Sequence, residues 1–266
     1  MHGTSAITAI TAQNTVEVRA VHPIPPEMVL AQVRAVLADI TVDAVKVGML
    51  GTVEVTLAVA QALEELPSGT PVVVDPVMVS ESGARLLEED ARQALVREIL
   101  PRASVLTPNL PEARVLAGVP AARAEDPAHR DSAEADRCDE DDLEAEALAR
   151  AVLALGPRIV VLTGGHRARA SDLFLDSAGD GRVVRIEGVR HPDGAAHGSG
   201  CTHSSVLAAQ LALGRTPLEA ARIARALAGA AVAHGLRDVG AGPGPVDVMD
   251  LAAVRTNWRS SAAGLP

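Results

Sequence analysis

Short apolar runs, mostly of β-branched residues, alternate along this chain with longer segments of helical spacing, and this alternation strongly constrains the fold. Three of the runs are expected to be buried strands: 44–47, 72–74 and 159–162. Helices are expected at 26–37, 52–66 and 88–100. Strands that alternate with helices indicate βαβ units and therefore an α/β fold around a largely parallel sheet.

Two regions depart from this alternation. Apolar runs on either side of a glycine-containing turn predict an antiparallel hairpin near 171–187. The stretch 121–146 is crowded with Asp and Glu, which predicts a solvated, mobile insertion that runs into a helix near Asp142. Strands and helices continue beyond it, so we expect residues 1–266 to form one domain with a tail at 250–266.

Composition narrows the possible functions. A formal net charge of −10 and an aromatic content of 1% argue against nucleic-acid binding, which needs basic side chains and stacking platforms. Two cysteines cannot build a disulfide framework and indicate a reducing compartment. No apolar run reaches membrane-spanning length. The sequence therefore predicts an acidic cytoplasmic protein that binds neither nucleic acid nor a membrane.

The most informative motif is the sequence HGSGCT at 197–202, which directly precedes an alanine-rich segment expected to be mainly helical. Gly198 and Gly200 allow a tight turn whose N–H groups, with those of the helix start, form an anion hole for a transferring phosphoryl group. Thiol pKa values tend to fall at helix starts, so Cys201 is expected to accept a proton from a substrate hydroxyl. An ordinary glycine-rich cap with a small buried cysteine explains the motif equally well.

Polar turns follow several of the expected strands. Asn109 and Glu112 offer oxygen ligands for Mg²⁺ held through water, although the same residues suit a helix start even better. Asp75 follows 72–74 and suits either a cap or a magnesium site. Glycine-containing turns come after two further strands, at 48–51 and 163–166. Because α/β sheets bind ligands at the carboxyl edge of their strands, we expect a single site there.

In combination these motifs resemble the hydroxymethylpyrimidine/phosphomethylpyrimidine kinases of thiamine biosynthesis, within the ribokinase-like superfamily. The resemblance runs from about Gly3 to Val246 and rests on the segments 8–15, 46–50, 74–78, 106–113, 164–166, 197–202 and 244–246. It implies a three-layer αβα sandwich with a mostly parallel central sheet, ATP and Mg²⁺ as cofactors, and a homodimer. It also implies two successive phosphorylations, of 4-amino-5-hydroxymethyl-2-methylpyrimidine and of its monophosphate.

The resemblance assigns roles to individual residues. Gln13 would bind the polar edge of the pyrimidine, and Met49 and Val77 would contact its ring. The anion hole and the catalytic base are implied at Gly198, Ser199, Gly200 and Cys201. The nucleotide site is implied at Asn109, Glu112, Thr163 and Gly165, and the metal site at Asp75 and Glu112.

The chain departs from the family pattern in two respects that matter. Relatives open with a strand and a glycine-rich turn that help to enclose the pyrimidine, whereas this sequence starts after them at Met1. We expect a misassigned start, because Met1 stands where the family usually has a small apolar residue, often valine, before the sequence His-Gly. If the chain starts at Met1, the sheet would lack a central strand and substrate binding would suffer. Thr163 stands where many relatives carry a lysine that pairs with ATP phosphate, and Lys46, the only lysine, is expected to lie elsewhere. Charge neutralisation would then rely on Mg²⁺, the anion hole or an arginine.

Two alternatives stay open beside a pyrimidine kinase. A pyridoxal-type kinase is possible because relatives with a cysteine in this anion hole phosphorylate that ring too. An inactive, N-terminally truncated remnant belongs to another class of protein; the missing segment favours it, and the presence of Asn109, Glu112 and the 198–201 loop opposes it.

Overall fold

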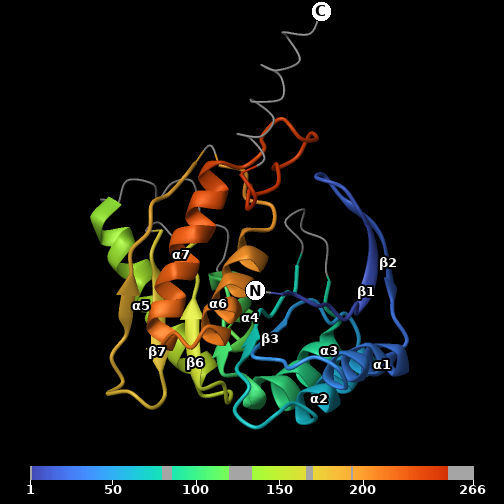
Figure 1. Ribbon diagram of the computed structural model, residues 1–266. Coiled ribbons are helices and arrows are strands. Elements are labelled where there is room, and N and C mark those ends of the chain that lie inside the picture. Colours follow the sequence, from blue (N-terminus) through green and yellow to red (C-terminus); the bar gives the residue numbers. More distant parts are fainter. Residues whose placement is uncertain (1, 80–85, 120–133, 166–169, 193, 251–266) are drawn as a thin grey trace, which may run out of the picture.

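The structure is a computed structural model that describes residues 2–79, 86–119, 134–165, 170–192 and 194–250 (Figure 1). Six strands form its main sheet in sequence order: β3 (Val45–Val47), β4 (Val72–Val74), β5 (Val105–Leu106), β6 (Ile159–Leu162), β7 (Asp172–Asp176) and β8 (Val184–Ile186). The first four strands are parallel, and β7 and β8 run antiparallel to their neighbours. Both the parallel sheet and the hairpin are therefore confirmed.

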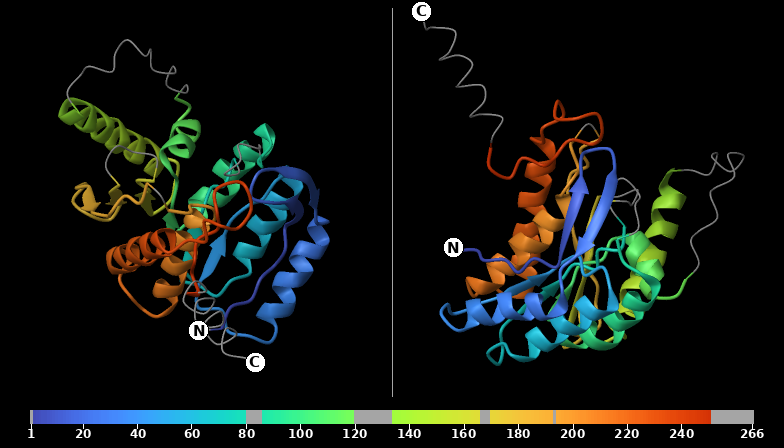
Figure 2. Two further views of the ribbon diagram at one scale, coloured as in Figure 1. Left: turned by 90° about the horizontal axis from the view of Figure 1, so that it is seen from above. Right: turned by 90° about the vertical axis from the view of Figure 1, so that its right-hand side faces the viewer.

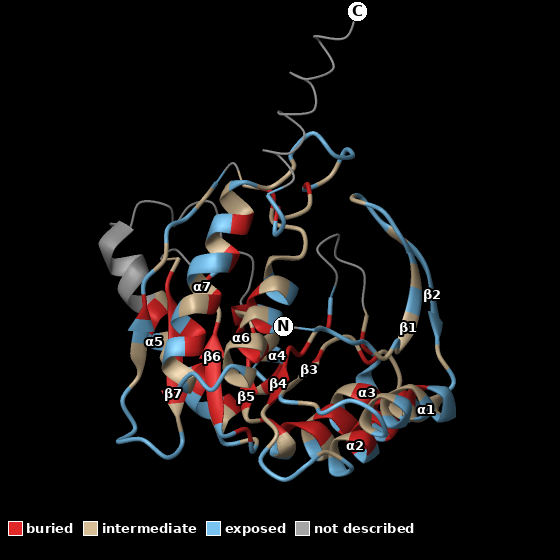
Figure 3. Ribbon diagram, viewed as in Figure 1, coloured by how far each residue is buried: buried red, intermediate tan, exposed pale blue. Residues whose placement is uncertain are grey.

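Helices cover both faces of this sheet. One core holds side chains from α1 (Pro26–Leu37), α2 (Val53–Glu64), α3 (Glu89–Ala94), α4 (Leu110–Leu116) and α5 (Glu134–Leu153). The other holds side chains from α6 (Ser199–Ala212) and α7 (Pro217–Ala233). Along β4 the side chains alternate, so that Val74 packs in the first core and Val73 in the second. The buried strands lie between partly exposed helices (Figures 2 and 3), which confirms the three-layer sandwich.

A two-stranded hairpin stands beside the main sheet (Figures 1 and 2) and was not predicted from the sequence. It pairs β1 (Ala9–Gln13) with β2 (Val18–Pro23) in antiparallel register. Its tip rests on the far end of the described chain, where the Gly242 amide donates to Thr15 Oγ1 at 3.3 Å. A Cβ at Gly242 would lie 1.8 Å from the Thr15 carbonyl oxygen, so only glycine allows this approach.

Two expectations about the fold are wrong. The helix expected at 88–100 ends at Ala94 and continues as a π-helical turn and a 3₁₀ turn, in which Pro101 cannot donate a helical hydrogen bond. Helix α5 begins at Glu134 rather than near Asp142, and its second half is docked by an Arg114–Glu144 ion pair at 2.6 Å. The main sheet runs from β3 to β8 in unbroken order, and β3 forms one of its edges.

Parts of the predicted insertion and tail lie outside the described residues, namely 120–133 and 251–266. The side chain of Cys138 and the whole of His166 lie outside them as well. Within the described chain, no helix combines the length and the apolar character that crossing a bilayer requires.

Candidate active site

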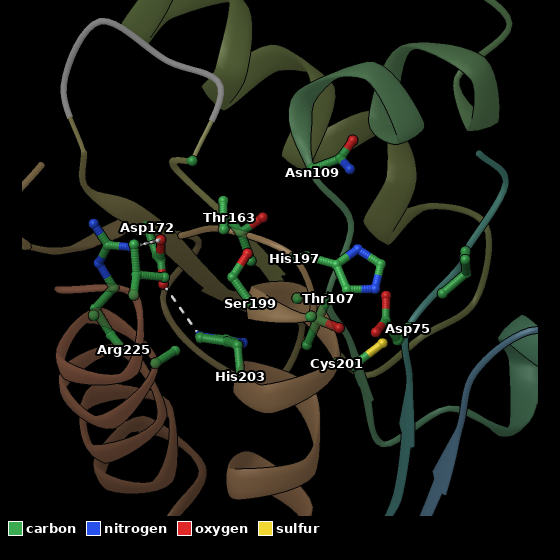
Figure 4. Close-up of a pocket in the computed structure, with 18 of the residues that line it drawn as sticks. Asp75, Thr107, Asn109, Thr163, Asp172, His197, Ser199, Cys201, His203 and Arg225 are labelled. Atoms are coloured by element: carbon green, nitrogen blue, oxygen red, sulfur yellow. Dashed lines mark ion pairs between the residues drawn. The ribbon is translucent and has the colours of Figure 1, made fainter. Parts of the chain in front are cut away.

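A pocket of about 500 Å³ opens at the carboxyl edge of the main sheet (Figure 4). It is lined by all twelve residues to which the sequence assigned a role: Gln13, Met49, Asp75, Val77, Asn109, Glu112, Thr163, Gly165, Gly198, Ser199, Gly200 and Cys201. The strands β3 to β6 bring their following turns to this edge, because parallel strands end on the same side. The twelve residues therefore lie around one pocket, and the role of each residue stays a prediction.

The start of α6 has the backbone geometry that an anion hole requires. Gly198 has φ 88°, a left-handed conformation that favours glycine, and the helix begins at the next residue. Within the described chain no side chain caps this helix start, and Ser199, Gly200 and Cys201 line the pocket. The loop is held from behind by the Val246 amide, which donates to the His197 carbonyl oxygen at 3.0 Å. Its first-turn N–H groups are therefore suited to an anionic group in the pocket.

Lys46 lies beside Asp75, on β3 rather than at the strand end that bears Thr163, and it is not among the residues that line the pocket. It pairs in register with Val73, which faces α6, so its side chain is directed to the same face of the sheet. Its Nζ lies 3.4 Å from Asp75 Oδ2. Asp75 also accepts a hydrogen bond of 2.9 Å from Ser204 Oγ, one turn along α6 from the anion hole. The carboxylate of Asp75 is therefore fixed between a cation and a hydroxyl.

The pKa of the Cys201 thiol is raised, contrary to the expected lowering. Surrounding protein atoms cause most of this shift, and the negative charges of Asp75 and Glu112 add to it. The positive charge of Lys46 opposes the shift. Cys201 is exposed to the pocket, yet partial desolvation of its thiol by the surrounding protein and two acidic neighbours outweigh the helix start in setting the charge of this thiol.

Asn109 and Glu112 form a reciprocal capping box at the start of α4. The Asn109 amide donates to Glu112 Oε2, and Asn109 Oδ1 accepts from the Glu112 amide, each at 2.9 Å. Burial raises the pKa of Glu112 to about 8, the Asn109 amide opposes this change, and the charge of Asp75 increases it. The helix-start interpretation is confirmed, and the same carboxyl still borders the pocket.

The residues present fit a magnesium ion that is shared with phosphate oxygens. Burial, and to a smaller extent the charge of Asp75, raises the pKa of Glu112, and a cation beside the two carboxyl groups would favour their ionised forms. Among the described residues no cluster of three or more His, Cys, Asp or Glu could enclose a metal. Mg²⁺ suits such an open site, because it usually keeps several waters and takes one or two carboxylates plus substrate phosphates.

The side of the pocket expected to hold the nucleotide includes residues to which the sequence assigned no role. Thr163 lies beside Asn109 through a parallel bridge, as expected for neighbouring strand ends. Three further polar side chains line this side: Asp172, His203 and Arg225 (Figure 4). They come from separate elements with no shared motif, and the only signal was an aspartate at the start of an apolar strand.

On the substrate side, Gln13 ends β1 and is exposed in the pocket. Thr8 Oγ1 donates to the Met49 carbonyl oxygen at 2.7 Å and so joins the hairpin to the turn after β3. Val77 follows β4 and completes this side.

This fold and site together define an enzyme of the ribokinase-like class. A sequence profile of phosphomethylpyrimidine kinases matches residues 1–247. The chain therefore belongs to the phosphomethylpyrimidine kinase family.

Individual relatives agree with this assignment. The hydroxymethylpyrimidine/phosphomethylpyrimidine kinase of Haemophilus influenzae is 38% identical over 248 residues, which cover 92% of this chain and 85% of the relative. A phosphomethylpyrimidine kinase structure from Clostridium difficile has a TM-score of 0.66 at 31% identity and covers 85% of this chain and 84% of that one. The pyridoxal kinase of Staphylococcus aureus in complex with AMP-PCP and pyridoxal has a TM-score of 0.73 at 26% identity, covering 94% and 83%.

Proposed function

We propose that the protein transfers the γ-phosphoryl group of ATP to the hydroxymethyl group of 4-amino-5-hydroxymethyl-2-methylpyrimidine, and then a second one to the resulting monophosphate. One observation carries this proposal: the pocket joins the residues expected to hold the pyrimidine, Gln13, Met49 and Val77, to the anion hole of α6. A relative named for both activities shares most of the chain.

Cys201 acts as the general base of the first transfer. Its Sγ takes the proton of the hydroxymethyl group while that oxygen attacks the γ-phosphorus, and the bond to the β-phosphate oxygen breaks to leave ADP. The raised pKa of Cys201 keeps most of the thiol protonated, so the charge of Lys46 assists by favouring the thiolate. The N–H groups of Gly200 and Cys201 donate to the oxygens of the group in transfer.

Asp75 and Glu112 would hold Mg²⁺ beside the anion hole, and Asn109 keeps the Glu112 side chain in place through the capping box. When bound, the ion neutralises part of the negative charge of the phosphate groups. Without it, the N–H groups of the anion hole alone would have to balance that charge. Thr163 and Gly165 border the nucleotide.

The second transfer needs no base. A phosphate monoester has its second pKa at about 6, so the monophosphate is already largely a dianion at neutral pH. Cys201 is therefore expected to matter for the alcohol much more than for the monophosphate.

The test is ATP-dependent phosphorylation of both pyrimidines by the full chain, followed by chromatography of products and ADP. Cys201→Ala should lower turnover of the alcohol by about 10²–10⁴-fold and affect the monophosphate far less. Its thermal midpoint should stay close to that of the parent protein. Near-normal turnover of the alcohol would remove the base assignment. No turnover of either pyrimidine by the parent chain would refute the proposed function and favour the inactive remnant.

A pyridoxal-type kinase is the second candidate, favoured by the similarity to the pyridoxal kinase of Staphylococcus aureus. Parallel assays with pyridoxal and the pyrimidine alcohol separate the two. A higher kcat/KM for pyridoxal would overturn the first choice.

We also propose a cytoplasmic homodimer. The resemblance to the family implies the dimer, and exposed apolar side chains on the β1–β2 hairpin support an interface there: Ile10, Val16 and Val21. Light scattering of the parent protein and of Ile10→Asp tests this. A monomeric parent protein would refute the dimer, and an unchanged dimer in the variant would refute its placement at the hairpin. A cytoplasmic location fits a chain with two cysteines, and fractionation of the native host would test it.

A further inference from the structure

Asp172 is a fully buried carboxylate at the first residue of β7, and the proposed reaction does not use it. Its Oδ1 accepts a hydrogen bond of 2.8 Å from the Gly164 amide. Its Oδ2 lies 3.2 Å from His203 Nε2, and its Oδ1 lies 3.8 Å from Arg225 Nη1 (Figure 4). A buried charge is tolerated only with partners of this kind. These contacts therefore explain how Asp172 can be buried as a carboxylate.

The three partners of Asp172 belong to three different walls of the pocket. Gly164 lies between Thr163 and Gly165 in the turn after β6. His203 is on α6, in the same helix turn that follows the anion hole. Arg225 is on α7, the helix that supplies further lining residues. One carboxylate therefore contacts the turn, the phosphate-binding helix and the outer helix.

Arg225 extends this network to a fourth wall. It donates to the Ala170 carbonyl oxygen, and its guanidinium packs against the backbone of Gly188. A Cβ at Gly188 would lie 2.1 Å from Arg225 Nε, so the backbone reaches the guanidinium closely. The next residues, Val189 and Arg190, line the pocket.

The charge of Asp172 is maintained despite its burial. Burial alone would raise the pKa of this carboxyl, but His203, Arg225 and the Gly164 amide together lower it. The group is therefore ionised at neutral pH and can hold its cationic and N–H partners.

We propose that Asp172 is a positioning residue that fixes the nucleotide end of the pocket relative to the anion hole. The inference rests on the proposed function, because it concerns where the nucleotide binds. The pyrimidine is expected to be held by Gln13, Met49 and Val77. These residues come from β1 and from the turns after β3 and β4, and none of these segments is among the contacts of Asp172 described above. Loss of its charge should therefore disturb nucleotide binding and spare pyrimidine binding.

The test compares Asp172→Asn with Asp176→Asn in the full chain. Asparagine keeps the size of Asp172 and can still accept from the Gly164 amide, but it no longer attracts His203 and Arg225. Asp176 is the matched control at the other end of β7, where its Oδ1 accepts from the Ala178 amide in the hairpin turn. Affinity for ADP with Mg²⁺ is measured by calorimetry, and KM is measured for ATP and for the pyrimidine alcohol.

Asp172→Asn should weaken ADP binding and raise KM for ATP by about tenfold, while KM for the pyrimidine changes less than twofold. Asp176→Asn should match the parent protein in all three measurements. An unchanged ADP affinity, or an equal rise in both KM values, would overturn the inference.

A milder variant keeps the inference testable if Asp172→Asn does not fold. His203→Gln removes one partner and leaves the carboxylate with Arg225 and Gly164, and it should shift ADP affinity in the same direction by a smaller factor. Unchanged ADP affinity in a folded His203→Gln would then count against the positioning role. A parent protein that binds ADP without phosphorylating the pyrimidine would refute the proposed function and leave this inference intact.

Discussion

The buried carboxyl of Glu112 should make the metal-free protein less stable as the pH rises, and Glu112→Gln should abolish this loss. Its pKa is about 8 in the folded protein, against an ordinary value of 4.5. Folding therefore favours the protonated form. The stabilisation is complete below the unfolded pKa and disappears as the pH rises through 8.

The size of the effect follows from proton counting. Between pH 6 and pH 8 the unfolded carboxyl is ionised throughout, whereas the folded one changes from almost fully protonated to about half protonated. Integration at about 1.4 kcal/mol per proton and pH unit gives a loss of about 2 kcal/mol in the free energy of unfolding. Glutamine cannot ionise and still accepts the Asn109 amide, because a capping box tolerates Gln in that position.

The assay is urea denaturation in the presence of a chelator at several pH values. The free energy of unfolding of Glu112→Gln minus that of the parent protein should rise by about 2 kcal/mol from pH 6 to pH 8. Glu219→Gln is the matched control, since Glu219 closes an exposed capping box with Thr216 and its pKa is lowered rather than raised. A flat difference for Glu112→Gln, or an equal rise for the control, would refute the reasoning. Kinase activity of Glu112→Gln should fall even as the protein gains stability.

Three further outcomes are expected. Lys46→Met should slow iodoacetamide labelling of Cys201 at pH 8 by roughly tenfold, as followed by peptide mass spectrometry. Lys46→Arg keeps the positive charge and should retain most of the labelling rate. Equal labelling rates in the two variants would contradict the charge effect. Gly164→Ala should lower both the thermal midpoint and the affinity for ADP, because its Cβ would lie 2.2 Å from the Ser171 carbonyl oxygen. A Cβ at Gly165 would meet no atom of the described residues within 4 Å. Gly165→Ala should therefore leave the thermal midpoint unchanged in the same calorimetric scan. Thr216→Ala should cost about 1 kcal/mol in urea denaturation by removing the cap of α7, and no loss would contradict the cap's contribution.

The strands of the main sheet, and the edge at which the site lies, could be predicted because short stretches of sequence specify them. Val72–Val74 is buried on both faces, and such a strand must consist of apolar residues throughout. Asp75, Asn109 and Thr163 follow their strands directly, so parallel pairing brings them to one edge whatever the details of packing.

The parts that could not be predicted depend on long-range contacts. The β1–β2 hairpin has mostly exposed residues and lacks the apolar alternation of a core strand. The position of Lys46 beside Asp75 follows from its register with Val73, which a single sequence does not specify. The network around Asp172 needs the final placement of β7, α6 and α7 together.

The contact between Thr15 and Gly242 has a consequence for synthesis of the protein. These two residues are 227 positions apart, and their contact anchors the tip of the hairpin that carries Gln13. During translation the hairpin leaves the ribosome long before this anchor of its tip exists. The sheet and its first helices can form as they emerge, but the tip of the hairpin on the substrate side of the pocket is anchored only when nearly the whole chain has been made. A ribosome-bound intermediate of this kinase would therefore be folded in its centre before it could retain a pyrimidine.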